Sequence, residues 1–584
     1  MKKILFAATV LCMMGCQNKP TNSTPALDPS NMDTSVAPNE SFYQYATGGW
    51  QAKNPLKPEH SSYNMFNVLN DNNEIRINEL FTQMTKENPA KGTVNQKIAD
   101  LYKLGLDSVR LNQEGAAPIR AELETILSLD DKKQLTPILS VMQMTSSSPL
   151  FSFGPEADLK KNYDAIDWKY LFDFAKINPE RVIVCQPEYM EALDKLIETT
   201  PIEDLRYYLA SQYLNAAAPY LDDNFYAASF DFYGRTMSGK QEPRPRWKRA
   251  MAIPNSALGE AVGEMYVEKF FPAEDKARMM TLVENLRTAL GQHIDQLDWM
   301  SDSTKMRARE KLAAFHVKIG YPDKWKDYST LEIDPTLSYW ENIQRASEWA
   351  TRDQLAKVGK AVDPEEWLMT PQTVNAYYNP TTNEICFPAA ILQPPFFNPA
   401  ADDAVNYGAI GVVIGHEMTH GFDDQGRQFD KDGNMNNWWT DADAEAFKQK
   451  TDILVKQFDA IEVLPARGDQ PAVFANGSLC LGENIADQGG LRVAYTALMN
   501  TLNGTEPEPI DGLTPAQRFY LSYATVWAQN IRDEEIARLT KLDVHSLGQW
   551  RVDATLRNLQ DFFDAFNITD GKMYMPVEER VIIW

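Results

Sequence analysis

One short stretch limits the fold and chemistry of this chain more than any other. Residues 411–420 read G-V-V-I-G-H-E-M-T-H, an apolar run that ends in the pattern H-E-x-x-H. Residues four apart in an α-helix are rotated by about 40°, so His416 and His420 lie on one face. Neutral imidazoles are good ligands for Zn²⁺. The sequence therefore predicts a buried helix that presents two ligands to one zinc ion.

Glu417 directly follows the first of these histidines and is the expected catalytic base. A catalytic zinc site has three protein ligands and leaves one position for water. A carboxylate beside a ligand can accept a proton from that zinc-bound water, which then attacks the substrate. The alternative interpretation is a pair of structural histidines on an amphipathic helix. It is disfavoured because the whole chain has only six histidines.

The third ligand has to come from another part of the chain. Glu483 and Asp487 are four residues apart in L-G-E-N-I-A-D-Q-G-G (481–490), so a helix places both carboxylates on one face. One can bind the metal while the other accepts a hydrogen bond from a ligand histidine and fixes its tautomer. Acids at this spacing usually form a solvated face, but these lie among apolar residues. Asp423 and Asp424 are further candidates for the supporting role, or form a helix-end turn.

Composition excludes several other classes of protein. The 584 residues amount to roughly four domain equivalents. With 43% hydrophobic and 24% charged residues, the composition is that of a globular protein. A net charge of −24 gives no basic surface for nucleic acid. Cys185, Cys386 and Cys480 are far apart without a C-x-x-C pattern, so we expect buried reduced thiols and at most one disulfide.

The first 40 residues are predicted to be an export signal and a tether. Lys2 and Lys3 precede an apolar stretch that is too short to span a bilayer, as in a secretory signal over residues 1–15. It ends in L-C-M-M-G-C, which is similar to a bacterial lipobox that makes Cys16 a lipidated first residue; the alternative is an ordinary signal with a chance cysteine. Polar, proline-containing residues 16–40 are expected to be a flexible tether. We therefore predict an exported protein, lipid-anchored in the bacterial periplasm or at the cell surface.

Most of the remaining chain is expected to be helical. Apolar residues recur at helical spacing from Met279 to Leu297, and Ser301 is a candidate cap for a second helix that ends near Phe315. Strand signals are sparse. The predicted segments are helices over residues 94–112 and 200–220, and a hairpin of residues 374–378 and 383–387 joined by N-P-T-T.

Several of these segments together resemble one known family. H-E-M-T-H-G-F-D-D (416–424) and E-N-I-A-D-Q-G-G (483–490) are similar to the signature pair of the neprilysin-type zinc peptidases, which include endothelin-converting enzyme and bacterial oligopeptidases. D-V-H-S (543–546), followed by R-V (551–552), resembles the family's C-terminal catalytic motif. Further similar segments are V-N-A-Y (374–377), N-E-I-C-F-P-A-A-I-L-Q-P-P-F-F (383–397), and residues 42–50, 246–249 and 319–323, so the resemblance covers residues 41–584.

The resemblance implies a role for each matching position. Glu417 would be the general base and then the proton donor to the leaving amine. His545 would stabilise the oxyanion, and Asp487 would orient a ligand histidine. The ligands of one zinc ion would be His416, His420 and Glu483. The substrate would be bound by Asn375 and Ala376 through its backbone, by Arg551 through a carbonyl, and by an apolar pocket of Phe66, Phe396, Val412, Val413, Val526 and Trp527. Core packing is the alternative for the pocket residues.

The family fold would be mainly α-helical with small β-sheets, in two lobes. Residues 41–89 would join a thermolysin-like catalytic lobe of residues 361–584. Residues 90–360 would form a helical lid lobe that encloses the site.

The implied function is that of a monomeric zinc endopeptidase that cleaves oligopeptides on the amino side of bulky hydrophobic residues. Ser61-Ser62 is followed by Tyr63-Asn64, without the arginine that grips a substrate carboxylate in some relatives, so dipeptidyl-carboxypeptidase action is not expected. Val581 stands where animal relatives have a cysteine, so their disulfide network is not expected either. The alternatives are a non-catalytic peptide-binding lipoprotein and a zinc hydrolase of non-peptide substrates. All expected catalytic residues are present, and the strand motif favours peptides.

Overall fold

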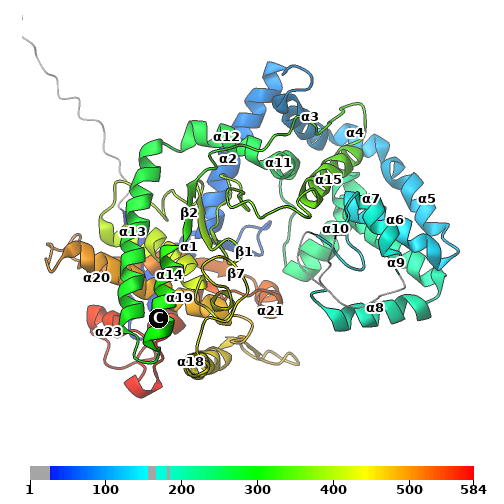
Figure 1. The fold of residues 1–584 in the computed structure, drawn as a ribbon. Helices are drawn as coiled ribbons and strands as arrows, with labels where there is room; N and C mark the ends of the chain where they lie inside the picture. The colour runs from blue at the N-terminus through cyan, green and yellow to red at the C-terminus, as the bar shows by residue number, and fades with distance from the viewer. Residues whose placement is uncertain (1–25, 155–165, 180–183) are drawn as a thin grey trace, which may run out of the picture.

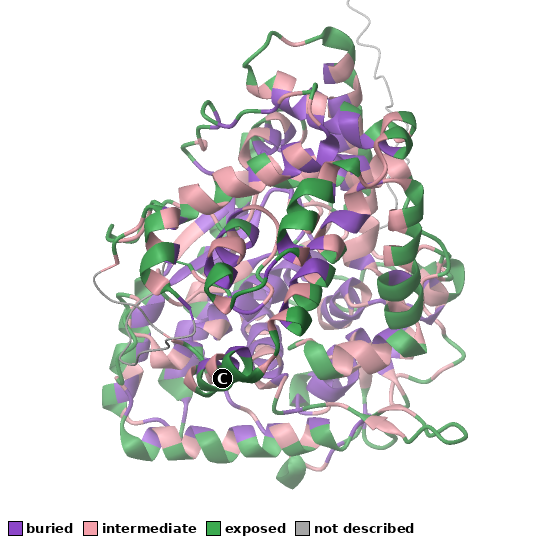
Figure 2. Cartoon of the chain, turned by 90° about the vertical axis from the view of Figure 1, so that its right-hand side faces the viewer, coloured by how far each residue is buried: buried purple, intermediate pink, exposed green. Residues whose placement is uncertain are grey.

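The computed structural model describes residues 26–154, 166–179 and 184–584, and shows two lobes of unequal size (Figure 1). Helices dominate both lobes, and the described strands form only small sheets. The expected fold class, mainly helical with two lobes, is therefore confirmed. Buried residues gather where the helices pack and exposed residues cover the outside, as Figure 2 shows.

Two separate hydrophobic cores underlie the two lobes. The helices of the larger lobe are α1 Phe42–Lys53, α2 Met65–Glu87, α3 Val94–Leu106, α11 Arg246–Ala257, α12 Gly259–Phe270, α13 Ala273–Gln296, α14 Asp302–Ala313, α16 Asp403–Asn406, α17 Val412–His420, α18 Asp441–Asp459, α19 Leu481–Leu502, α20 Pro515–Val526, α21 Asp533–Leu542, α22 Gly548–Leu556 and α23 Gln560–Phe566. Those of the smaller lobe are α4 Ser108–Glu114, α5 Arg120–Leu127, α6 Leu135–Thr145, α7 Trp168–Ala175, α8 Pro187–Thr199, α9 Ile202–Ala217 and α10 Asp223–Ser229.

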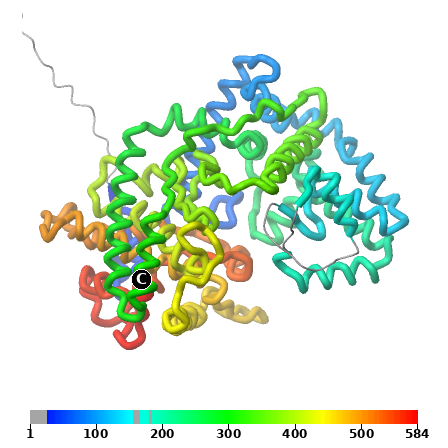
Figure 3. Tube along the Cα trace, viewed as in Figure 1, coloured from blue at the N-terminus to red at the C-terminus, as the bar shows by residue number. Residues whose placement is uncertain are grey.

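Helix α15 (Tyr339–Leu355) contributes to both hydrophobic cores. At its start, Trp340 packs into the smaller core, whereas Ala346 packs into the larger one. The tube in Figure 3 shows the chain leaving the larger lobe, forming the smaller lobe from its cyan segments and returning. Helices α11 to α14 lie within the expected lid lobe of residues 90–360 yet contribute to the larger core. The boundaries at 90 and 360 stay a prediction.

The predicted helices are present with modest changes. Helix α13 covers the periodic stretch from Met279, and α14 follows it. The expected helix over residues 94–112 is interrupted at Asp107. The side chain of Asp107 accepts a hydrogen bond from the backbone N–H of Arg110, and this bond caps the new helix α4. The break explains why one helical pattern became two elements.

The predicted hairpin is present, but its first strand begins three residues later than expected, at Tyr377. It forms part of a sheet in the order β2-β4-β3. Strand β4 (Glu384–Pro388) pairs in parallel with β2 (His316–Gly320) and antiparallel with β3 (Tyr377–Asn379). The other sheets pair β1 (Ser62–Asn64) with β7 (Gln529–Ile531), and β5 (Glu462–Leu464) with β6 (Val473–Phe474). Strand β3 is thus an edge strand among the described residues, and Asn375 and Ala376 lie just before it.

Helices α17 and α19 cross at unusually short range because glycines face each other. A Cβ atom on Gly415 would lie 2.7 Å from the carbonyl oxygen of Gly490, and one on Gly490 would lie 2.4 Å from the backbone nitrogen of His416. Side chains larger than hydrogen would push the helices apart. The G-G of the E-N-I-A-D-Q-G-G segment therefore brings the helix of Glu483 against the helix of His416.

The expected tether is shorter than predicted. Residues 26–40 pack against the larger lobe instead of extending from it: Leu27 and Met32 contact the core, and the Asp33 N–H donates to the carbonyl of Tyr45 at 2.8 Å. Two apolar side chains in a polar segment are enough to bury part of it. Residues 1–25, including the predicted signal and Cys16, lie outside the described residues.

No described helix is long and apolar enough to cross a membrane. Among the described cysteines, none forms a disulfide; Cys386 and Cys480 are buried as expected, whereas Cys185 is exposed.

Candidate active site

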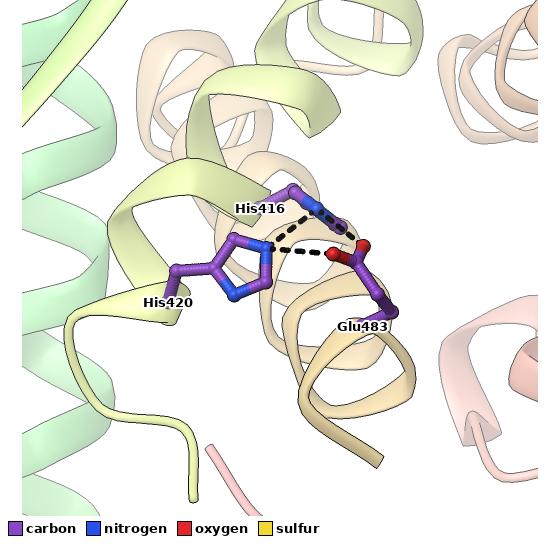
Figure 4. Close-up of side chains that lie close together, drawn as sticks. All are labelled: His416, His420 and Glu483. Atoms are coloured by element: carbon purple, nitrogen blue, oxygen red, sulfur yellow. Dashed lines mark hydrogen bonds and ion pairs between the residues drawn. The ribbon is translucent and has the colours of Figure 1, made fainter. Parts of the chain in front are cut away.

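Three potential metal ligands meet between α17 and α19 (Figure 4). Helix α17 presents His416 and His420 on one face, with their Nε2 atoms 3.0 Å apart. Glu483, in the first turn of α19, places its carboxylate oxygens 3.2 Å from Nε2 of His416 and 3.5 Å from Nε2 of His420. The predicted ligand residues are therefore brought together.

The outer nitrogen of each histidine is held by an aspartate. Nδ1 of His416 lies 2.9 Å from Asp487, and Nδ1 of His420 lies 2.6 Å from Asp423. Each carboxylate accepts the Nδ1–H, so the Nε2 lone pair of each ring faces the other ligands. Asp487 and Asp423, both predicted as supporting residues, occupy the positions that such a role requires.

The donor set fits zinc. Bond lengths near 2.0–2.1 Å place tetrahedral ligand atoms about 3.3 Å apart, close to the separations among these three side chains. Oε2 of Glu483 is buried and has no hydrogen-bond partner in the described part of the chain. Burial favours the neutral form of this carboxyl, but His416, His420 and Arg551 outweigh it and lower the pKa. A buried carboxylate oxygen without a hydrogen bond, beside two imidazole nitrogens, is what a bound cation would satisfy.

Glu417 and His545 complete the chemistry around the ligands. Glu417 is buried, and burial raises the pKa of its carboxyl despite the opposing effect of the nearby histidines. His545 is half exposed; its Nε2 lies 3.3 Å from Glu483, and its Nδ1 lies 2.7 Å from Asp543. Both residues line the same cleft as the ligands.

Arg551 makes an unpredicted contact. Its Nε and Nη2 donate to both oxygens of Asp487, at 2.8 and 2.6 Å, in a forked ion pair. Its guanidinium carbon lies 3.8 Å from the ring centroid of Trp527. Arg551 also lines the cleft, and its hydrogen bonds to described residues use Nε and Nη2. This ion pair fixes the orientation of Asp487 beside His416.

The cleft has a volume of about 400 Å³ and contains most of the predicted substrate-binding residues. Those that line it are Asn375, Ala376, Phe66, Val412, Val413, Trp527 and Arg551. Phe396 does not line it; it is fully buried behind Phe66, with ring centroids 4.6 Å apart. Val526 does not line it either and is 1% exposed. These two positions are core residues, because the last turn of α20 directs Val526 inward and Phe66 covers Phe396.

Sequence reasoning missed several residues of the cleft. Asp543 was part of a matching motif but had no predicted role. An aspartate side chain often accepts a hydrogen bond from the backbone N–H two residues later. Asp543 accepts the His545 N–H in this way, at 3.0 Å. Asp543 itself does not line the cleft; the lining residues without a predicted role are Tyr377, Tyr378, Pro380, Ile391, Gln425 and Gly426. Tyr377 and Ile391 lie in segments that resemble the family, but strand and loop packing decides which side chains of those segments face the cleft.

Comparisons with known proteins agree with this geometry. The sequence models of peptidase family M13 match residues 38–163, 157–322 and 375–582. The chain is 36% identical to the neutral endopeptidase of Lactobacillus helveticus, over 84% of this chain and 73% of that protein. It is 30% identical to human endothelin-converting enzyme 1, over 94% of this chain and 84% of the relative.

The solved structures give the same answer. The inhibitor complex of the Mycobacterium tuberculosis zinc metalloprotease Zmp1 has a TM-score of 0.88 and 32% identity to this chain, and covers 96% of this chain and 99% of the other. Fold and site are those of a zinc metallopeptidase. The chain belongs to peptidase family M13. It is a zinc metalloendopeptidase, as the resemblance to the neprilysin family implied, and zinc is its cofactor.

Proposed function

We propose that the protein cleaves short peptides on the amino side of bulky hydrophobic residues, with His416, His420 and Glu483 as zinc ligands. One observation carries this proposal: a single cleft contains the three ligands and the buried carboxylate of Glu417. The same cleft contains Asn375 and Ala376, which lead into the edge strand β3. A non-catalytic binding protein has no use for all of these groups together.

The protein's own residues move the protons in this scheme. Bound zinc supplies a Lewis acid that polarises the peptide carbonyl and makes water a stronger acid. Glu417 accepts the proton of the attacking water and returns it to the leaving amine. Its burial excludes bulk water from this exchange. The ring of His545, held at Nδ1 by Asp543, directs Nε2 toward the oxyanion that develops on the substrate and stabilises it.

The edge of β3 is proposed to hold the substrate backbone. An extended peptide can add to an open strand edge through main-chain hydrogen bonds, and Asn375 and Ala376 lead into that edge along the cleft. Arg551 donates to a carbonyl beyond the scissile bond. The side chain after that bond enters the apolar wall of the cleft, formed by Phe66, Val412, Val413, Ile391 and Trp527.

Replacement of Glu417 by glutamine tests the scheme. The amide keeps the shape of the side chain but cannot accept the proton, so we expect peptide cleavage to fall by about 10²–10⁴-fold while zinc stays bound. Cleavage of a mixed peptide library and metal content by mass spectrometry measure the two effects. Glu535→Gln, at a buried glutamate outside the cleft, is the matched control. Full cleavage by Glu417→Gln would refute the role of Glu417.

A further inference from the structure

Lys311 on α14 is a buried cation without a carboxylate partner among the described residues. The residue is 1% exposed. Its ammonium donates to the backbone carbonyls of Gly426 and Phe429, both at 2.7 Å. The rest of its surroundings is aromatic: the ring centroids of Tyr378, Phe422 and Trp438 lie 5.7–6.0 Å away.

This arrangement is costly to form. An ammonium loses its hydration on burial, and two carbonyls with three ring faces replace that hydration only in part. Burial accordingly lowers the pKa of Lys311 to about 7, although Asp423 and Asp430 act in the opposite direction. A methionine of similar length would fill the same space without this cost. What Lys311 contributes in return is therefore found in the groups that its amine binds.

The ammonium binds the loop of residues 421–429, which directly follows α17, the helix of His416 and His420. This loop turns back so tightly that a Cβ atom on Gly426 would lie 1.8 Å from the carbonyl oxygen of His420. The N–H of Gly426 donates to Oδ1 of Asp423 at 2.6 Å, and Oδ2 of the same aspartate meets Nδ1 of His420 at 2.6 Å. One residue, Gly426, thus links the Lys311 contact to the aspartate that orients a ligand.

A second connection joins Lys311 to strand β3, the proposed binding edge for the substrate. The side-chain amide of Asn383, the residue before β4, donates to the backbone carbonyl of Lys311 at 3.2 Å. The oxygen of that amide accepts the hydroxyl of Tyr378 on β3, at 3.1 Å. Lys311 is therefore the residue at which α14, loop 421–429 and the hairpin of β3 and β4 meet.

We propose that Lys311 is a positioning residue for the zinc site: its ammonium fixes loop 421–429 against α14 and so keeps Asp423 on His420. The inference rests on the ligand set proposed above. Loss of the ammonium frees the carbonyls of Gly426 and Phe429, the loop relaxes, and His420 loses its fixed orientation. Zinc affinity is the property that should change most.

The test compares two buried lysines. Lys97 on α3 is 3% exposed, and its ammonium donates to the carbonyls of Tyr328 and Ser329 at 2.7 and 3.0 Å, away from the cleft. Lys97→Met and Lys311→Met both remove a buried ammonium from two carbonyls, so both should lower the melting temperature. Only Lys311→Met should weaken zinc binding, by about 10–100-fold, as measured by competition with a chromophoric chelator.

A double-mutant cycle shows whether the effect passes through Asp423. If it does, Lys311→Met adds little to the loss of zinc affinity already caused by Asp423→Ala. The inference would be overturned if the losses of zinc affinity caused by Lys311→Met and Asp423→Ala multiplied in the double mutant. Equal zinc affinity in Lys311→Met and Lys97→Met would also overturn it. If Lys311→Met does not fold, Lys311→Gln, which keeps one donor group, enters the same comparison and has the same criteria. Failure of wild type and Lys97→Met to bind zinc would instead refute the proposed site.

Discussion

At the scale of single residues, the carboxylates around the ligands differ in what they hold. Asp487 is shared between His416 and Arg551, whereas Asp423 is shared between His420 and the backbone of its own loop. Spacing in the sequence predicted that these acids lie near the histidines. It could not predict the fork of Arg551 on Asp487, because that contact depends on how α22 packs against α19, 64 residues away.

The apolar wall of the cleft leads to a prediction at this scale. Phe66 lines the cleft beside Trp527, with ring centroids 5.7 Å apart. Phe66→Ala removes a face of the proposed pocket and should lower kcat/KM by about 10–100-fold for peptides with phenylalanine or leucine after the scissile bond. Peptides with alanine there should be affected much less. Phe474→Ala, at an exposed phenylalanine on β6, is the control. Equal losses for both peptide series would argue against the pocket.

At the scale of elements, α22 carries two buried charged side chains that face different neighbours. Arg551 faces α19, and Asp553 accepts hydrogen bonds from the Tyr43 N–H and the Ser41 hydroxyl, both at 2.8 Å, at the start of α1. Sequence periodicity predicted such helices well, as for α13. It could not predict which helices pair, since the partners α1 and α22 lie some 500 residues apart in the chain.

Asp553 should make stability depend on pH. Burial raises the pKa of its carboxyl from 3.8 to about 6. Between these values the folded state binds more protons than the unfolded state, so the contribution of Asp553 to stability falls as pH rises and is lowest above pH 6. Asp553→Asn keeps one acceptor oxygen and removes the titration. Between pH 5 and pH 8 the free energy of unfolding of the wild type should therefore fall by about 1 kcal/mol relative to that of Asp553→Asn. Urea titrations at the two pH values measure this difference. A difference that is constant with pH, or opposite in sign, would contradict this.

At the scale of the whole molecule, the family resemblance predicted two lobes and implied which segments share a site. The residues in each hydrophobic core were beyond sequence reasoning, because α11 to α14 join the larger core through contacts with distant segments. The packing of residues 26–40 was missed for a similar reason. Their polar composition suggested a tether, and only the neighbouring helices show where Leu27 and Met32 are buried.

The lipid anchor is a prediction for the whole molecule. Leu27 and Met32 line one pocket together with Leu521 of α20, and Figure 1 shows α20 on the side of the larger lobe away from the smaller lobe. An anchor at Cys16 would then hold the enzyme with its smaller lobe free. Cys16→Ser should move the protein from the membrane fraction to the soluble fraction, abolish incorporation of labelled palmitate and leave peptide cleavage unchanged. Retention of label in Cys16→Ser would exclude this cysteine as the attachment site.

The cleft takes its walls from segments far apart in the chain, from Phe66 on α2 to Arg551 on α22. A chain that is still being synthesised or transported across a membrane has no place where these groups meet. Peptide-cleaving activity can therefore begin only after the distant segments have folded together. Until then the unfolded chain cannot cleave the cell's own peptides.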